Sequence, residues 1–237
     1  MIDHPLLVHE LHTFALMLVS DYPVSDALHD LVDATAAILG VHGAGVSLAS
    51  DDRLALATAS PEDITSLEAL QERSQVGPSI DAFRTGTPVL VTDLTTEPAD
   101  GSAHWPELAG VAATTGIVAL AAVPLHLHGA HLGVLDLYDA QPHAWSQDEV
   151  ETAELLAALA TGYLANASRL DQARQTAAQL QVALDSRVVI EQAKGVLAGE
   201  RGISVDAAFQ VLRAHARAHR IPLREVARAV VDGRVRP

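Results

Sequence analysis

Residues 186–201 read Ser-Arg-Val-Val-Ile-Glu-Gln-Ala-Lys-Gly-Val-Leu-Ala-Gly-Glu-Arg, and this stretch places the one lysine of the chain, Lys194, between two arginines. Arg187 and Arg201 each lie seven residues from Lys194, and seven residues turn an α-helix through about 700°, nearly two complete turns. The three cations therefore share one face of a predicted helix. A helix face that carries only positive charge favours phosphate as its partner.

A second interpretation of the same residues is a solvated helix face held by weak ion pairs. Glu191 lies four residues after Arg187 and three before Lys194. Pairs at these spacings each stabilise a helix by about 0.2–0.5 kcal/mol. The segment alone fits both interpretations, so the rest of the chain has to distinguish them.

Charge is distributed unevenly along the chain. Residues 171–237 carry 11 lysines and arginines against 7 aspartates and glutamates, a net of +4, whereas residues 1–170 carry 4 against 23, a net of −19. An acidic surface repels nucleic acid and a basic surface attracts it. The sequence therefore predicts two functional parts, of which the C-terminal one is suited to RNA or DNA.

Composition excludes several classes of protein. The 237 residues are 49% hydrophobic, enough for a well-formed core, and include no cysteine. The absence of cysteine excludes disulfides, thiolate catalysis and cysteine-ligated metals. The longest apolar run, residues 116–125, is too short to span a bilayer, and the first residues lack the basic region of a secretory signal. We therefore expect no membrane contact and a cytoplasmic protein.

The first 140 residues alternate between helical and strand-like patterns. Helical spacing of apolar residues predicts helices over residues 5–19 and 24–39. Residues 95–115 include Pro98, Gly101 and Pro106 and predict an irregular excursion over the surface. The other predicted elements are strands at 44–49, 54–60, 88–92, 116–126 and 131–138, with helices at 61–73 and 78–84.

Several short motifs in this part resemble a GAF domain, and the resemblance covers roughly residues 20–165. They are Gly77-Pro78, Asp81-Ala82-Phe83-Arg84-Thr85-Gly86-Thr87-Pro88-Val89, Asp93-Leu94, Trp105-Pro106, Pro124-Leu125 and Gly133-Val134-Leu135-Asp136-Leu137-Tyr138. The resemblance implies an α+β fold with an antiparallel sheet flanked by helices. It also implies a pocket on one sheet face, which in different members holds a cyclic nucleotide, a chromophore, haem, another small molecule or no known ligand. Turn and packing motifs do not identify that ligand, so the cofactor stays open.

Three histidines near the predicted hairpin have spacing that could serve a metal. His126 and His128 alternate along a strand and so point to one face, and His131 follows the turn. Such a set could bind zinc or present an axial ligand to haem. The alternative is that the end of a hairpin is polar and solvated. Ser79 stands where relatives often have cysteine, so a thioether-linked chromophore is excluded.

A very long helix is predicted to start at Ser146. Ser146 and Glu149 form a capping box, and no proline follows until Pro222. Apolar residues then recur at alternating steps of three and four, as in the seam of a coiled coil: Leu156, Leu159, Tyr163, Ala167, Leu170, Ala173, Ala177, Leu180 and Leu184. We expect residues 147–165 to close the first domain and residues 166–190 to pair in a parallel homodimer.

The remaining residues predict a module of three helices. The long helix should end near Gly199 or Gly202, Ser204 is an N-cap for a helix to about residue 218, and Pro222 begins a third helix to residue 231. The motifs of this module resemble an ANTAR domain over about residues 175–232. They are Ser186-Arg187, Ile190-Glu191-Gln192-Ala193-Lys194-Gly195, Ser204-Val205-Asp206-Ala207-Ala208-Phe209, Leu212-Arg213 and Val226-Ala227.

The ANTAR resemblance implies an RNA-binding module of a transcription antiterminator. Dimers of such modules hold paired stem-loops in nascent messenger RNA, so that a terminator hairpin cannot form and RNA polymerase is affected only indirectly. The resemblance leaves open whether Phe209 belongs to the core or stacks on a base. The RNA-binding residues expected from this segment are Arg187, Ala193, Lys194, Gly195, Arg201, Phe209 and Arg213.

Together these patterns predict a GAF sensory domain at residues 1–165, a coiled-coil linker helix at 166–185 and an ANTAR RNA-binding domain at 175–237. We expect no enzymatic activity, since a sulfoxide reductase built on a GAF fold would need cysteines. Two alternatives stay open: a DNA-binding transcriptional regulator with a GAF ligand sensor, and a scaffold whose C-terminal helices bind another protein. The GAF ligand, the RNA targets and the direction of switching are not encoded in any motif.

Overall fold

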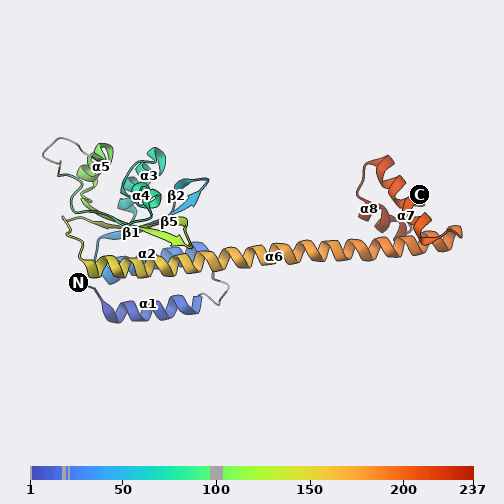
Figure 1. The fold of residues 1–237 in the computed structure, drawn as a ribbon, viewed down its shortest axis with the longest axis horizontal. Coiled ribbons are helices and arrows are strands. Elements are labelled where there is room, and N and C mark those ends of the chain that lie inside the picture. Colours follow the sequence, from blue (N-terminus) through green and yellow to red (C-terminus); the bar gives the residue numbers. More distant parts are fainter. Residues whose placement is uncertain (1, 18–19, 21, 97–103) are drawn as a thin grey trace. The chain divides into compact units, whose positions relative to one another are not determined.

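The computed structural model describes residues 2–17, 20, 22–96 and 104–237, and the chain divides into two compact units, residues 1–168 and 169–237 (Figure 1). Helix α6 (Gln147–Arg201) begins in the first unit and ends in the second. The other elements of the first unit are α1 (His4–Met17), α2 (Val24–Leu39), β1 (Gly43–Ser50), β2 (Arg53–Ser60), η1 (Glu62–Ile64), α3 (Thr65–Ser74), α4 (Pro78–Thr85), β3 (Val89–Val91), α5 (Pro106–Thr115), β4 (Ala119–Leu127) and β5 (Ala130–Asp139).

The strands of the first unit form one antiparallel sheet in the order β2-β1-β5-β4-β3. The hairpin between β4 and β5 turns at His128 and Gly129, whose φ angles of 50° and 84° suit a tight two-residue connection. The predicted α+β fold with an antiparallel sheet flanked by helices is confirmed.

Each face of the sheet carries its own hydrophobic core, and the pleat of β5 separates the two. Leu135 and Leu137 pack with residues of α1, α2 and α6, whereas Val134 and Tyr138 pack with residues of α3, α4 and α5. Figure 1 shows α2 and α6 on one side of the sheet and the three shorter helices on the other. Alternation along a strand thus places every second side chain of β5 under α3 and α4.

The predicted irregular excursion over residues 95–115 is wrong in its second half. Helix α5 begins at Pro106 and ends at Thr115, followed by Gly116 with φ 79°. Proline fits the first turn of a helix, where its missing N–H has no intrahelical partner, so Pro106 starts this helix and does not interrupt it. Residues 97–103 lie outside the described part of the chain.

Helix α6 begins where the capping box was predicted. The Ser146 backbone N–H donates to the Glu149 carboxylate at 2.8 Å, and the Ser146 hydroxyl donates to the same oxygen at 2.7 Å. Leu156 and Tyr163 are buried in the first unit, whereas every residue from 168 to 185 is exposed. The predicted seam is therefore covered within the chain only in its first part.

The second unit consists of the last part of α6 with α7 (Val205–His219) and α8 (Leu223–Val231). Helix α6 ends before Gly202, which has φ 66°, and the Ser204 side chain caps α7 by accepting from the Ala207 N–H at 3.1 Å. Among the described residues, none of the helices is both long and apolar enough to span a bilayer.

Candidate functional site

The three helices of the second unit surround a small hydrophobic core that fixes their mutual positions. Its fully or largely buried members are Ala193, Leu197, Ala208, Leu212, Ala216, Val226, Ala227 and Val230. Because α6 and α7 pack through these side chains, residues beside the core on the two helices come close together at the surface. Three of the predicted RNA-binding residues, Lys194, Phe209 and Arg213, lie along that boundary.

Lys194, Phe209 and Arg213 form one cluster across α6 and α7. The Lys194 Nζ lies 5.5 Å from the centre of the Phe209 ring, and the Arg213 Cζ lies 5.7 Å from the same centre. Phe209 is only partly buried, so the aromatic ring reaches the surface between two cations. Such a cluster can accept phosphate at the cations and stack a base on the ring.

The ion-pair interpretation of the segment is also realised in the structure. The Lys194 Nζ donates to both carboxylate oxygens of Glu191 at 2.8 Å, and the lysine side chain is only 14% exposed. Glu191 therefore holds Lys194 against the aromatic ring and offsets part of its charge. A phosphate that reached Lys194 would compete with this carboxylate.

The flanking arginines of the opening segment are exposed. Arg187 and Arg201 form no hydrogen bond or ion pair within the described residues. Both lie at the seven-residue spacing from Lys194 that places the three cations along one face of α6. Their guanidinium groups are thus available to a partner, whereas that of Arg213 is already beside Phe209.

Ala193 and Gly195 occupy very different surroundings. The Ala193 side chain is fully buried in the core of the second unit, so the structure does not place it on the predicted RNA-binding face. A Cβ added at Gly195 would meet nothing within 4 Å, so no packing within the chain requires glycine there. Glycine in an exposed helix costs about 1 kcal/mol relative to alanine, and a closely approaching partner would explain it.

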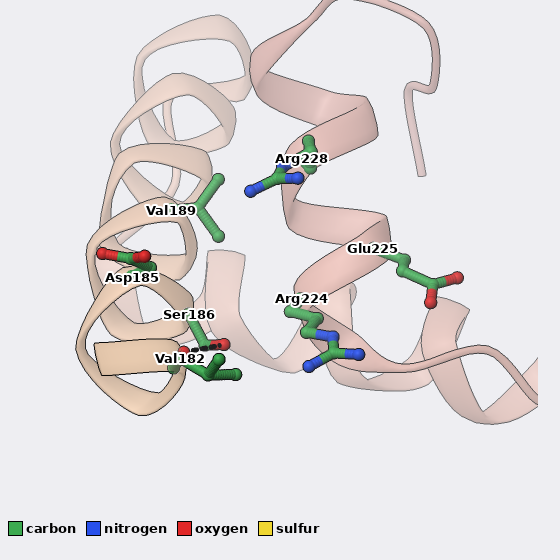
Figure 2. Close-up of a pocket in the computed structure, with 7 residues that line it drawn as sticks. All are labelled: Val182, Asp185, Ser186, Val189, Arg224, Glu225 and Arg228. Atoms are coloured by element: carbon green, nitrogen blue, oxygen red, sulfur yellow. Dashed lines mark hydrogen bonds between the residues drawn. The ribbon is translucent and has the colours of Figure 1, made fainter. Parts of the chain in front are cut away.

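A groove of about 300 Å³ lies between α6 and α8 (Figure 2). Figure 2 shows the Arg228 guanidinium directed toward Val189, while the Glu225 carboxylate turns away from the groove. Val189 and Lys194 are five residues apart, about 140° around the helix axis, so this groove opens on a different face of α6 from the Lys194 cluster. It is lined by Val182, Asp185, Ser186, Val189, Arg224, Glu225 and Arg228.

The first unit holds a buried pair of carboxyl groups under α3 and α4. Glu68 of α3 and Asp136 of β5 are 1% and 0% exposed. The Ser47 hydroxyl donates to Glu68 Oε2 at 3.3 Å, and the Ser79 hydroxyl donates to Asp136 Oδ1 at 2.7 Å. The other oxygens, Glu68 Oε1 and Asp136 Oδ2, receive no hydrogen bond from any described residue.

Burial dominates the protonation of this pair. It raises the pKa of Glu68 to about 7, although hydrogen bonds from Tyr138 and Ser47 lower it. Burial, and then the charge of Glu68, raises the pKa of Asp136 well above its usual range. Two adjacent carboxyl groups of this kind titrate as a pair and not as independent acids.

Sequence reasoning did not identify this pair. Asp136 alternates with Val134 and Tyr138 on β5, so the pleat alone places a charged residue at a core position, and that signal was present in the sequence. Glu68 gave no comparable signal, because its burial depends on how α3 packs on the sheet. Ser79, the serine at a position where relatives often have cysteine, joins the same network through its hydrogen bond to Asp136.

The structure does not bring the three hairpin histidines together as a zinc site would require. His126 pairs with His131 across β4 and β5, and the ring of His131 bonds through Nδ1 to the Phe83 carbonyl. Within the described ranges, no three His, Cys, Asp or Glu side chains are grouped so that they could hold a metal ion. The histidine at position 128 occupies the turn with positive φ.

Comparison with family models gives two matches. A model of the GAF domain matches residues 23–164, and a model of the ANTAR domain matches residues 178–231. A comparison with curated proteins found no match.

Solved structures resemble the first unit. The GAF domain of a phosphoenolpyruvate-protein phosphotransferase from Coxiella burnetii is 17% identical, with a TM-score of 0.53 over 70% of this chain and 96% of that one. The corresponding Acinetobacter domain is 17% identical, with a TM-score of 0.51 over 68% and 94%. The free methionine-R-sulfoxide reductase from Neisseria meningitidis is 18% identical, with a TM-score of 0.50 over 68% and 89%. At these identities the likeness concerns the fold alone.

Proposed function

Since the chain belongs to the GAF family and carries an ANTAR domain at its C-terminal end, we propose that it regulates transcription antitermination by binding stem-loops of nascent messenger RNA in response to a signal. GAF and ANTAR domains are regulatory modules, and the proposal includes no catalytic step. We assign residues 1–165 to the sensor, 166–185 to a coiled-coil linker and 175–237 to RNA binding, in a cytoplasmic protein.

The observation that carries this proposal is the convergence of Lys194, Phe209 and Arg213 at the surface of the ANTAR module. RNA loops expose phosphates together with unstacked bases, and proteins recognise them with cations and aromatic faces. An aromatic ring between two cations offers both contacts within one site. Arg187 and Arg201 extend the cationic face along α6, and Gly195 allows close approach of the RNA backbone.

Dimerisation would supply the second site that a pair of stem-loops needs. Leu170, Leu180 and Leu184 are 42%, 61% and 58% exposed along a stretch of α6 that nothing in its unit covers. Leucines repeated at steps of three and four gain stability by packing against the same stripe of a second copy. Two protomers joined in parallel would present two RNA-binding faces at a set separation and so hold two loops away from a terminator hairpin.

Binding of the full chain to an RNA that carries two short stem-loops tests the proposal. We expect Lys194→Ala and Arg213→Ala each to weaken binding at least tenfold, because each removes a charge-assisted contact worth about 1.5–3 kcal/mol. Arg228→Ala is the matched control, since it removes the same charge from the groove face and should change affinity far less. Equal affinities for all four proteins would exclude the Lys194 cluster as the RNA site.

Competition with duplex DNA of the same length distinguishes the main alternative. A small basic module of three helices can also enter a major groove, as a DNA-binding regulator would require. We expect the hairpin RNA to compete far more effectively than the duplex. Preferential displacement by the duplex would favour the DNA-binding regulator.

A further inference from the structure

We propose that Glu68 and Asp136 share an exchangeable proton, and that its uptake and release set how firmly α3 and α4 hold to the sheet. The proton site is a property of the first unit by itself. Its role as a signal rests on the proposed sensory function of that unit. The pair is remote in sequence from every residue assigned to RNA.

The geometry of the two carboxyl groups favours a proton between them. Both carboxyl groups are enclosed, and each keeps one oxygen, Glu68 Oε1 and Asp136 Oδ2, to which no described residue donates. Leaving two adjacent buried carboxylates charged and undersolvated is costly. A single proton supplies the missing donor, because a protonated carboxyl can bond to its neighbour. Such a bond lowers the pKa of Glu68 and raises that of Asp136.

Among the residues that the structure describes, no cation acts on the pair. The other titratable groups that act on it are Glu72 on α3 and Tyr138 on β5, and neither is positively charged. Strand β1 and helix α4 contribute only the hydroxyl groups of Ser47 and Ser79. The charge of the pair is therefore controlled by protons and not by a salt bridge.

Small neighbours on the sheet make room for the pair. Asp136 lies opposite Gly45 on β1 and opposite Ala122 on β4. A Cβ at Gly45 would lie 2.2 Å from Glu68 Oε1, so the glutamate occupies the space that the glycine leaves. The space is filled by a carboxyl group of α3, and the proton therefore sits at the contact between helix and sheet.

Release of the proton should loosen that contact. Glu68 belongs to α3, and Ser79, the partner of Asp136, belongs to α4, so added negative charge acts where both helices meet β5. Folding raises the pKa of both groups, that of Glu68 to about 7, so the stabilisation is complete at low pH, and the part due to Glu68 is lost as the pH rises through about 7. Between about pH 5 and 7 the folded unit holds the proton of Glu68, which the unfolded chain has released.

Urea unfolding of the full chain tests this inference. The two tryptophans, Trp105 and Trp145, both lie in the first unit, so their fluorescence reports on that unit alone. Between pH 5 and 7 the unfolding constant should rise with pH more steeply in the wild type than in Glu68→Gln. The difference should be about tenfold per pH unit, because the variant retains Asp136 but lacks the carboxyl group of Glu68. Above pH 8 the two slopes should converge.

Glu72→Gln is the matched control, one turn along the same helix. It should keep the wild-type pH dependence, with its midpoint moved slightly to lower pH because Glu72 raises the pKa of Glu68. Identical slopes for the wild type and Glu68→Gln would overturn the inference. RNA binding is not measured in this experiment, so its failure is separate from failure of the proposed function.

Infrared spectroscopy provides a readout that does not depend on the stability of a variant. The folded wild type should show a protonated-carboxyl band that decreases as the pH is raised through about 7, and Asp136→Asn should alter it. Absence of any protonated carboxyl at pH 6 would overturn the proposal. If the band were absent and sodium or ammonium ions stabilised the unit instead, the pair would be a cation site.

Discussion

Phe209 lies at the centre of the candidate RNA site, and its two possible roles can be separated by one substitution. Leucine preserves an apolar side chain of similar bulk, so Phe209→Leu should cost less than about 1.5 kcal/mol of folding stability. It removes the aromatic face, and loss of a stacked base costs about 1–3 kcal/mol. We therefore expect RNA affinity to fall about tenfold, measured by fluorescence anisotropy, while Phe209→Tyr retains it. Equal affinities for the leucine and tyrosine variants would identify Phe209 as a packing residue.

The positions of some site residues could be predicted from the sequence, and those of others depend on tertiary packing. Helical spacing placed Lys194 beside Arg187 and Arg201, and the capping residue Ser204 fixed the start of α7. Spacing could not reveal that Ala193 faces the core, because this depends on where α7 and α8 pack around α6. The Glu68 carboxyl is a similar case, since only the tertiary contact of α3 buries it.

At the scale of the helix, the exposed leucines of α6 give the clearest prediction. Leu180→Asn with Leu184→Asn should convert a dimer to a monomer, because each substitution places an amide at a position that would be buried between two helices. Light scattering coupled to size-exclusion chromatography measures the change. Val182→Asn is the control, since Val182 is similarly exposed at 51% but lines the groove toward α8. A wild-type protein that is monomeric at all concentrations would contradict the predicted seam.

The elements were predictable where local signals agreed with the fold. The capping box at Ser146 and the turn at His128 and Gly129 are local devices, and both appear in the structure. Helix α5 was not predicted, because Pro106 indicates a break in a loop and a first helical residue equally well. Which residues of the long seam are buried depends on the sheet of the first unit, since Leu156 is buried there and Leu180 is exposed.

For the whole molecule, the contrast between an acidic first part and a basic second part should appear in the salt dependence of RNA binding. Each phosphate neutralised by a cation contributes about 0.7–0.9 to the slope of log affinity against log salt concentration. We expect Lys194→Ala to reduce that slope by about 1 per site, whereas Phe209→Leu leaves it unchanged. Titrations at several potassium chloride concentrations measure both. A slope near zero for the wild type would favour the protein-binding scaffold.

Lys194 is the one lysine in the chain, and its ammonium group lies within the cationic cluster. Amine-directed chemistry therefore has a single side-chain target in this protein, at the surface assigned to the transcript. Acylation of that nitrogen, by acetylation or by an amine-reactive reagent, would remove the charge of the lysine and free Glu191 from its ion pair, so it should weaken RNA binding as Lys194→Ala does.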